Sequence, residues 1–337
     1  MAYFATKRFN YWAQLGILTA FTGVGLIIGG LASLIPLIGK VTLGDLSSTK
    51  TLMENLLKPE NANAFRWMNT ISTFCLFFLP VVMYALLCHK KPFVHLGFKP
   101  EFNPLSAIIV LFIMLAALPM VSALQELTEM LPWSKATRIT FKLAEENYNK
   151  QVAVMARMNN FTDYLVSVLV IALLPAIFEE ALFRGGLQNL LSRWFKMPVL
   201  AIVVTAIIFS AIHGSYLGFL SRFALGFVLG WIYYRTGNIW LNILGHFFNN
   251  AFAVTMLYVT TKPGEKLNPG KIDESFPLWI GLLSIAFVYG LFILFERVNK
   301  KEIDHPGEEL PVPGVAYTDN PFINDTTGAT SNTNQWQ

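Results

Sequence analysis

Two adjacent acids and a base stand at the end of a long apolar segment, in the stretch Phe178-Glu-Glu-Ala-Leu-Phe-Arg184. A charged side chain at the centre of a bilayer costs roughly 2.5–3.5 kcal/mol on insertion scales. An acidic pair in such a segment is therefore a hypothesis of a functional site, and the rest of the chain must supply its partners.

Three pairs of polar or aromatic side chains are spaced four residues apart, which places each pair on one face of a helix. The pairs are Glu180 with Arg184, Phe209 with His213, and His246 with Asn250. Glu179 lies about 100° from Glu180 around a helix, so the two acids can have different roles. We expect Glu180 to pair with Arg184, while Glu179 points into the bundle.

These residue types can activate water. A desolvated carboxylate can act as a general base near neutral pH, and a histidine can help to activate water or stabilise an oxyanion. The amide of Asn250 can donate to charge that develops on an attacked carbonyl. No serine or cysteine stands at nucleophile spacing from these groups, so they predict a hydrolase that uses water directly. Two histidines and a glutamate are also a plausible zinc set.

The composition places this chemistry in a membrane. Of the 337 residues, 54% are hydrophobic and 14% are charged, and the mean hydropathy is +0.49. Such a chain has too little polar material to cover a soluble globule. The net charge of +4 lies in particular loops and gives no support for nucleic-acid binding. We expect an all-α integral membrane protein that contacts membrane lipids.

About eight apolar segments have roughly the 20 residues that span a bilayer. They are residues 11–38, 68–88, 104–124, 161–183, 198–215, 217–234, 239–260 and 277–296. The expected bundle of about eight transmembrane helices belongs to a membrane domain at 1–303. Residues 304–337 are rich in Pro, Gly, Asn, Thr and Asp and are expected to form a disordered cytoplasmic tail. Residues 135–158 fit an interfacial amphipathic helix and a soluble loop helix equally well.

The basic residues of short loops predict the orientation of the chain. They follow the second, fourth, sixth and eighth segments, at Lys90, Lys91, Lys99, Arg193, Lys196, Arg235, Arg297, Lys300 and Lys301. If these loops are cytoplasmic, so are the N-terminus, with Lys7 and Arg8, and the C-terminus. We expect a multi-pass protein of the plasma (inner) membrane.

The helical rise predicts a mismatch of depth among the polar residues. Glu180 and His213 each lie about 16 residues, or roughly 24 Å, from a turn near 194–198. His246 lies about eight residues from the turn at 235–238, which places it roughly 12 Å shallower. Helix tilt, a bent helix, or a turn that sinks below the surface could each remove this mismatch.

The motifs together resemble a known family. Glu179-Glu180-x-x-x-Arg184, Phe209-x-x-x-His213 and His246-x-x-x-Asn250 are similar to the signature motifs of the CPBP (Abi) family, the CAAX protease and bacteriocin-processing intramembrane endopeptidases. The resemblance covers a core of about residues 161–255. Within the family, the chain resembles the type II CAAX prenyl endopeptidases. It implies an endopeptidase that cleaves a membrane protein or peptide.

The resemblance also implies roles for single residues. Glu179 and His213 would activate the water, and His246 and Asn250 would form the oxyanion hole. Three residues would support them: Glu180, Arg184 and Phe209. This mechanism requires no metal or other cofactor, so we expect none; a zinc ion held by Glu179, His213 and His246 is the alternative.

Each of these residues also has a structural interpretation. Glu180 and Arg184 could only stabilise a helix, and His246 with Asn250 could only join helices through hydrogen bonds. The alternative function is a non-catalytic membrane immunity or regulatory protein that binds a partner, and a transporter is a third class. The complete polar set favours the peptidase. We assign no role to His89, His95 or His305, and the sequence predicts no oligomeric state.

Overall fold

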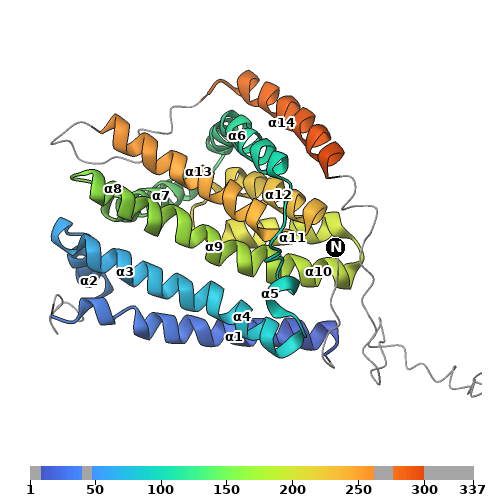
Figure 1. Ribbon diagram of the computed structural model, residues 1–337. Coiled ribbons are helices and arrows are strands. Elements are labelled where there is room, and N and C mark those ends of the chain that lie inside the picture. Colours follow the sequence, from blue (N-terminus) through green and yellow to red (C-terminus); the bar gives the residue numbers. More distant parts are fainter. Residues whose placement is uncertain (1–8, 40–47, 262–275, 300–337) are drawn as a thin grey trace, which may run out of the picture.

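The computed structural model describes residues 9–39, 48–261 and 276–299, which form helices and no strands (Figure 1). This agrees with the predicted all-α fold; the predicted tail at 304–337 lies outside the described residues. The α-helices are α1 (Tyr11–Ala32), α2 (Thr49–Leu56), α3 (Ala62–Thr73), α4 (Leu79–Cys88), α5 (Pro92–His95), α6 (Pro104–Met130), α7 (Lys135–Met155), α8 (Phe161–Ser167), α9 (Leu174–Glu180), α10 (Asn189–Phe195), α11 (Pro198–Ala211), α12 (Phe219–Thr236), α13 (Ile239–Thr260) and α14 (Leu278–Val298). Short 3₁₀ or π-helical segments are η1 (Ile35–Leu37), η3 (Pro59–Asn61), η4 (Phe74–Phe78), η5 (Val168–Leu173) and η6 (Ala181–Gln188).

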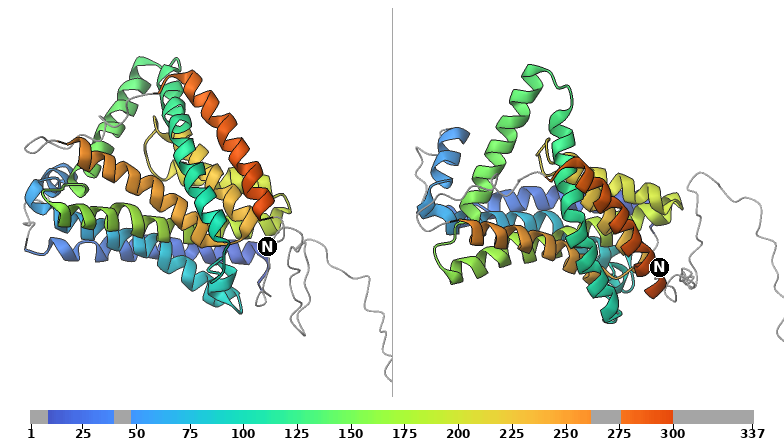
Figure 2. Two further views of the ribbon diagram at one scale, coloured as in Figure 1. Left: turned by 45° about the horizontal axis from the view of Figure 1, so that its top comes forward. Right: turned by 90° about the horizontal axis from the view of Figure 1, so that it is seen from above.

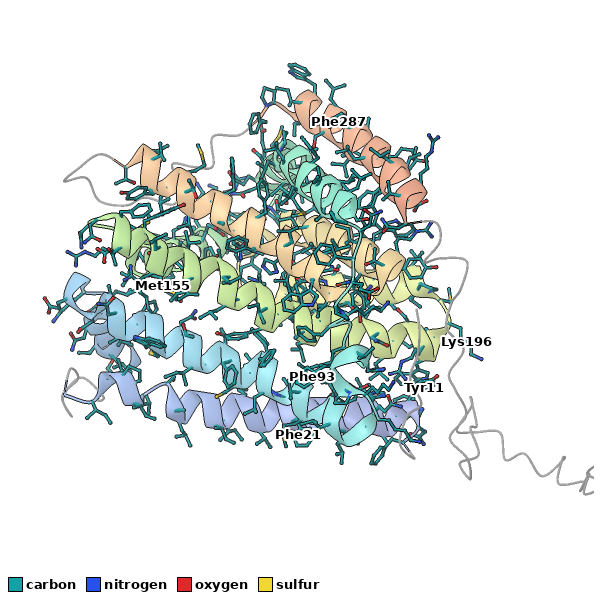
Figure 3. The ribbon with its side chains drawn as sticks, viewed as in Figure 1. Tyr11, Phe21, Phe93, Met155, Lys196 and Phe287 are labelled. Atoms are coloured by element: carbon teal, nitrogen blue, oxygen red, sulfur yellow. The ribbon has the colours of Figure 1, made fainter. Side chains whose placement is uncertain are left out.

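Five helical segments of the described chain are long and apolar enough to cross a membrane. They are Tyr11–Leu37, Ala62–Cys88, Pro104–Met130, Phe161–Phe195 and Leu278–Val298. The chain is therefore a multi-pass membrane protein. The other three predicted spans are also helical, but α11 is shorter, and α12 and α13 carry many of the polar residues discussed below. Exposed apolar side chains cover the outer helices; Phe287 on α14, 62% exposed, points away from the bundle (Figure 3).

The helices pack mainly through two cores of buried apolar residues, and Figure 1 shows how these helices are arranged. One apolar core joins α1 and α4 to α9 and η6, through residues such as Leu18, Val81 and Phe183. The other joins α6 and α14 to α12 and α13, through residues such as Ile113 and Leu229. Helices α9, α11, α12 and α13 therefore meet near the middle of the bundle, where their side chains are shielded from lipid and can be polar.

Glycine allows two of these contacts to be very close. A Cβ atom added at Gly25 of α1 would clash with the carbonyl oxygen of Cys75 in η4, and one at Gly230 of α12 would lie 2.8 Å from Ile202. Only a residue without a side chain fits there, as in small-xxx-small packing between membrane helices.

The residues that the sequence placed at different depths are in contact, since Nδ1 of His246 lies 2.8 Å from the Glu180 carboxylate. The turn between α12 and α13 that precedes His246 is buried within the protein. Asn238 and Ile239 in this turn are 1% and 0% exposed. The Asn238 amide donates to the carbonyl of Glu101 at 2.8 Å, and the Ile239 N–H donates to the carbonyl of Gly97 at 2.9 Å. The segment between α4 and α6 thus covers the turn.

Candidate active site

The two acids stand at the end of α9 and are both buried, with Glu179 8% and Glu180 0% exposed. The Glu180 carboxylate lies 3.1 Å from Nε of Arg184 and 2.8 Å from Nδ1 of His246 on α13. The predicted pairing of Glu180 with Arg184 is confirmed as a contact. The residues after Glu180 form the π-helical segment η6 rather than the α-helix that the sequence predicts. Such segments often occur at functional sites.

Glu179 points the other way, toward two histidines. Its Oε2 atom lies 3.9 Å from Nε2 of His213 and 3.8 Å from Nε2 of His246. Both distances are too long for direct hydrogen bonds, and this buried oxygen has no hydrogen-bond partner among the described residues. Groups at such distances are commonly joined through water. Glu179 is therefore the acid that remains available to a ligand.

Both histidines are oriented by a contact at Nδ1. His213 lies just beyond the end of α11, where its Nδ1 is 2.8 Å from the carbonyl oxygen of Phe209. A carbonyl oxygen can only accept, so Nδ1 carries the proton and Nε2 of the neutral ring is an acceptor. The Nδ1 of His246 likewise donates to Glu180. The Nε2 atoms of both rings thus face Glu179.

Phe209 and Arg184 pack around this group. The guanidinium of Arg184 lies 4.9 Å from the centre of the Phe209 ring and donates to the carbonyl of Gly226 on α12 at 3.2 Å. The same ring lies edge-on to His213 and His246, with centroids 4.8 and 6.0 Å away. Phe209 therefore separates the ion pair from the histidines and fixes their rings.

Asn250 lies one turn after His246 on α13, in the same cavity. Its Nδ2 atom is 3.5 Å from the carbonyl of Ile171, at the limit of a hydrogen bond, and its Oδ1 accepts from Asn249 at 3.3 Å. The amide is thus held weakly on its donor side. The structure places all four residues predicted to be catalytic around one space.

That space is a cavity of about 470 Å³ between α3, α6, α7, α9, α12 and α13. Helix α7 closes one side and lies beside the bundle (Figure 2). It is amphipathic with no fully buried residue, and its Glu145 and Tyr148 line the cavity. The sequence indicated an amphipathic helix here, but not that it borders the site.

The sequence also missed two residues of structural importance. His89 and His95, which we assigned no role, are 0% and 3% exposed, with their rings stacked 3.3 Å apart. Burial, and then the neighbouring Arg193 and His89, hold the pKa of His95 well below its ordinary value, so its ring is neutral. These histidines fix the segment that covers the α12–α13 turn. His305 lies outside the described residues.

The donor atoms of Glu179, His213 and His246 suit zinc chemically, but their arrangement does not form a zinc shell. Ligands around a tetrahedral zinc ion lie about 3.3 Å apart. The distances of 3.8 and 3.9 Å from Glu179 to the two Nε2 atoms are wider. No three His, Cys, Asp or Glu side chains in the described part of the chain are grouped to hold a metal ion.

Comparison with known proteins agrees with the motif pattern. Residues 161–252 match the family model described as "Type II CAAX prenyl endopeptidase Rce1-like". This range contains all seven motif residues, and it confirms the resemblance for this part of the chain. The rest of the chain, including α1 to α6 and α14, lies outside the match.

Two relatives from Bacillus subtilis (strain 168) cover a similar length. One is "Uncharacterized protein YpbD", 34% identical over 88 residues, which are 25% of this chain and 42% of the relative. The other is "Putative membrane peptidase YdiL", 30% identical over 93 residues, which are 26% of this chain and 36% of the relative. The matches thus span less than half of either relative, and no solved structure matches significantly.

Proposed function

We propose that this protein is an intramembrane endopeptidase that hydrolyses a peptide bond with a water molecule activated by Glu179 and His213. The observation that carries the proposal is the unpartnered Oε2 of Glu179, which faces the Nε2 atoms of His213 and His246 in a cavity. The family described as prenyl endopeptidases and the relative described as a membrane peptidase support the same reaction class.

In the proposed mechanism Glu179 is the general base and His213 orients the water. As the water oxygen attacks the carbonyl carbon of the substrate, its proton passes to Glu179 and the carbonyl oxygen becomes an oxyanion. The carbon–nitrogen bond then breaks, and Glu179 returns the proton to the leaving amine. No metal is needed for this sequence of steps.

His246 and Asn250 are the proposed donors to the oxyanion. Because Nδ1 of His246 already donates to Glu180, its Nε2 can donate only when the ring carries both protons. The carboxylates of Glu180 and Glu179 lie 2.8 and 3.8 Å from this ring. Asn250, held only by a 3.5 Å contact on its donor side, needs little rearrangement to turn its Nδ2 toward the oxyanion.

The decisive experiment compares membrane peptides from cells that express the wild type or the Glu179→Gln variant. We expect specific cleavage products with the wild type and none with Glu179→Gln at equal protein abundance. Glu296→Gln, which changes an acid of α14 that pairs with Arg235, is the matched control and should leave the products unchanged. Identical peptide sets from the wild type and Glu179→Gln would favour a non-catalytic membrane protein instead.

We further propose that both termini face the cytoplasm at the plasma membrane, because of the basic loops. Lys196 follows α10, and Met155 marks the end of α7 at the other end of the bundle (Figure 3). In intact cells a membrane-impermeant maleimide should label a Lys150→Cys variant on α7, and should label Lys196→Cys only after permeabilisation. The native Cys75 and Cys88 are buried and give little background. The reverse labelling pattern would show the opposite orientation.

A further inference from the structure

The cavity that holds Glu179 also contains a cation without an acidic partner, Arg222 of α12. Its guanidinium stacks over the ring of Tyr148 on α7, 5.0 Å from the ring centre. In the described residues it makes no ion pair, and its buried Nη1 atom has no hydrogen-bond partner. The Nη1 atom packs against Gly218, so an anion in the cavity would be bound by the other N–H groups of the guanidinium.

The acids of the cavity do not fill that need. Glu145 on α7 accepts from the Ser215 hydroxyl at 2.5 Å, and Glu179 faces the two histidines. Arg222 also lies one turn into α12, and the first turn of that helix carries no acid. The positive end of the helix dipole therefore adds to the attraction of Arg222 for an anion.

The stacking on Tyr148 leaves the useful donors free. An aromatic ring occupies a face of the guanidinium, whereas the N–H groups point outward in its plane and can bind both oxygens of a carboxylate. A purely structural role, in which Arg222 only joins α7 to α12, would use the face and leave its charge without an acid among the described residues. A cation in that state that lines a cavity favours a ligand.

Arg222 is also positioned near the reacting groups. One turn further along α12, the carbonyl of Gly226 accepts from Arg184, the partner of Glu180. A Cβ atom added at Gly226 would lie 3.4 Å from Phe209, so this part of α12 is fixed against the site. Arg222 and Glu179 line the same cavity, so a peptide bound at Glu179 can extend toward Arg222.

We propose that Arg222 forms a subsite that binds a carboxylate of the peptide substrate, either its C-terminal carboxylate or an Asp or Glu side chain. This inference rests on the proposed endopeptidase function, because it treats the occupant of the cavity as a peptide. It makes Arg222 a residue that determines specificity and takes no part in bond cleavage.

The test uses the purified full chain in detergent and three fluorescent pools of random heptapeptides. The first pool has neutral side chains and an amidated C-terminus, the second has neutral side chains and a free C-terminal carboxylate, and the third has one Asp and an amidated C-terminus. Retention on the immobilised protein measures binding, and mass spectrometry of the same samples measures cleavage. The second and third pools distinguish the two sources of the carboxylate.

We expect the wild type to retain at least one charged pool about tenfold more strongly than the neutral pool. Arg222→Gln should abolish that preference and leave retention of the neutral pool unchanged, which also shows that the variant is folded. Arg222→Lys should keep part of the preference, since it keeps the charge without the two-pronged geometry. Arg235→Gln, on the same helix but paired with Glu296, is the control and should behave as the wild type.

Equal retention of all three pools by the wild type, or a preference that survives Arg222→Gln, would overturn the subsite. The cleavage readout tests the proposed function separately. Cleavage without a charge preference would refute the subsite and keep the endopeptidase. A charge preference that depends on Arg222, without cleavage of any pool, would keep an anion site and count against the endopeptidase.

Discussion

Replacing Glu180 or Arg184 by alanine is expected to lower the free energy of unfolding by about 3–5 kcal/mol. The two side chains are 0% and 1% exposed and lie 3.1 Å apart, so either change leaves an uncompensated charge in the interior. Glu180→Ala also removes the acceptor of His246 Nδ1. Both variants should accumulate to lower levels and unfold at lower denaturant concentration in detergent micelles.

A matched control is available on the surface of the same protein. Glu146 and Lys150 on α7 form an ion pair of 2.8 Å, with side chains 60% and 54% exposed. Glu146→Ala should change the free energy of unfolding by at most about 0.5 kcal/mol, because exposed pairs contribute little. If Glu180→Ala and Arg184→Ala unfold like the wild type and differ from it only by a lower catalytic rate, the structural role assigned to the buried pair is wrong.

The sequence predicted which residues meet at the site better than it predicted their surroundings. Spacing alone placed Glu180 with Arg184, and the order of the motifs identified the two histidines that approach Glu179. These predictions work because helix periodicity fixes which side chains share a face.

Other features depend on contacts between distant segments, which spacing does not encode. The turn before His246 is held by hydrogen bonds from Asn238 and Ile239 to the segment between α4 and α6. The position of α7 over the cavity depends on contacts such as that of Tyr148 with Arg222. In the sequence, Arg222 is one basic residue in an apolar segment, and only its unpartnered guanidinium in the cavity indicates a function.

Loss of Glu179 or His213 is expected to have the largest effect on catalysis. With a peptide identified from the membrane comparison, Glu179→Gln and His213→Ala should each lower kcat by about 10²- to 10⁴-fold. Because both are proposed to act on the same water, the losses from the two changes should not multiply. The double variant should be at most a few-fold slower than the slower of the two single variants. The single-turnover rate of folded protein in detergent is the measurement, with Glu296→Gln as the control. Losses that multiply would show that the two residues act in separate steps.

Exhaustive chelation separates the proposed mechanism from its zinc alternative. If Glu179 and His213 activate water directly, the wild-type rate should stay within about twofold after chelation, since no lone pair of the site is committed to an ion. A zinc enzyme would instead lose turnover on chelation and regain it with added zinc. Stoichiometric zinc in the active protein, lost together with activity in His246→Ala, would overturn the metal-free mechanism. Glu180 would then orient His246 as a ligand, because a metal-bound imidazole commonly donates its other N–H to a carboxylate, as Nδ1 of His246 does to Glu180 at 2.8 Å.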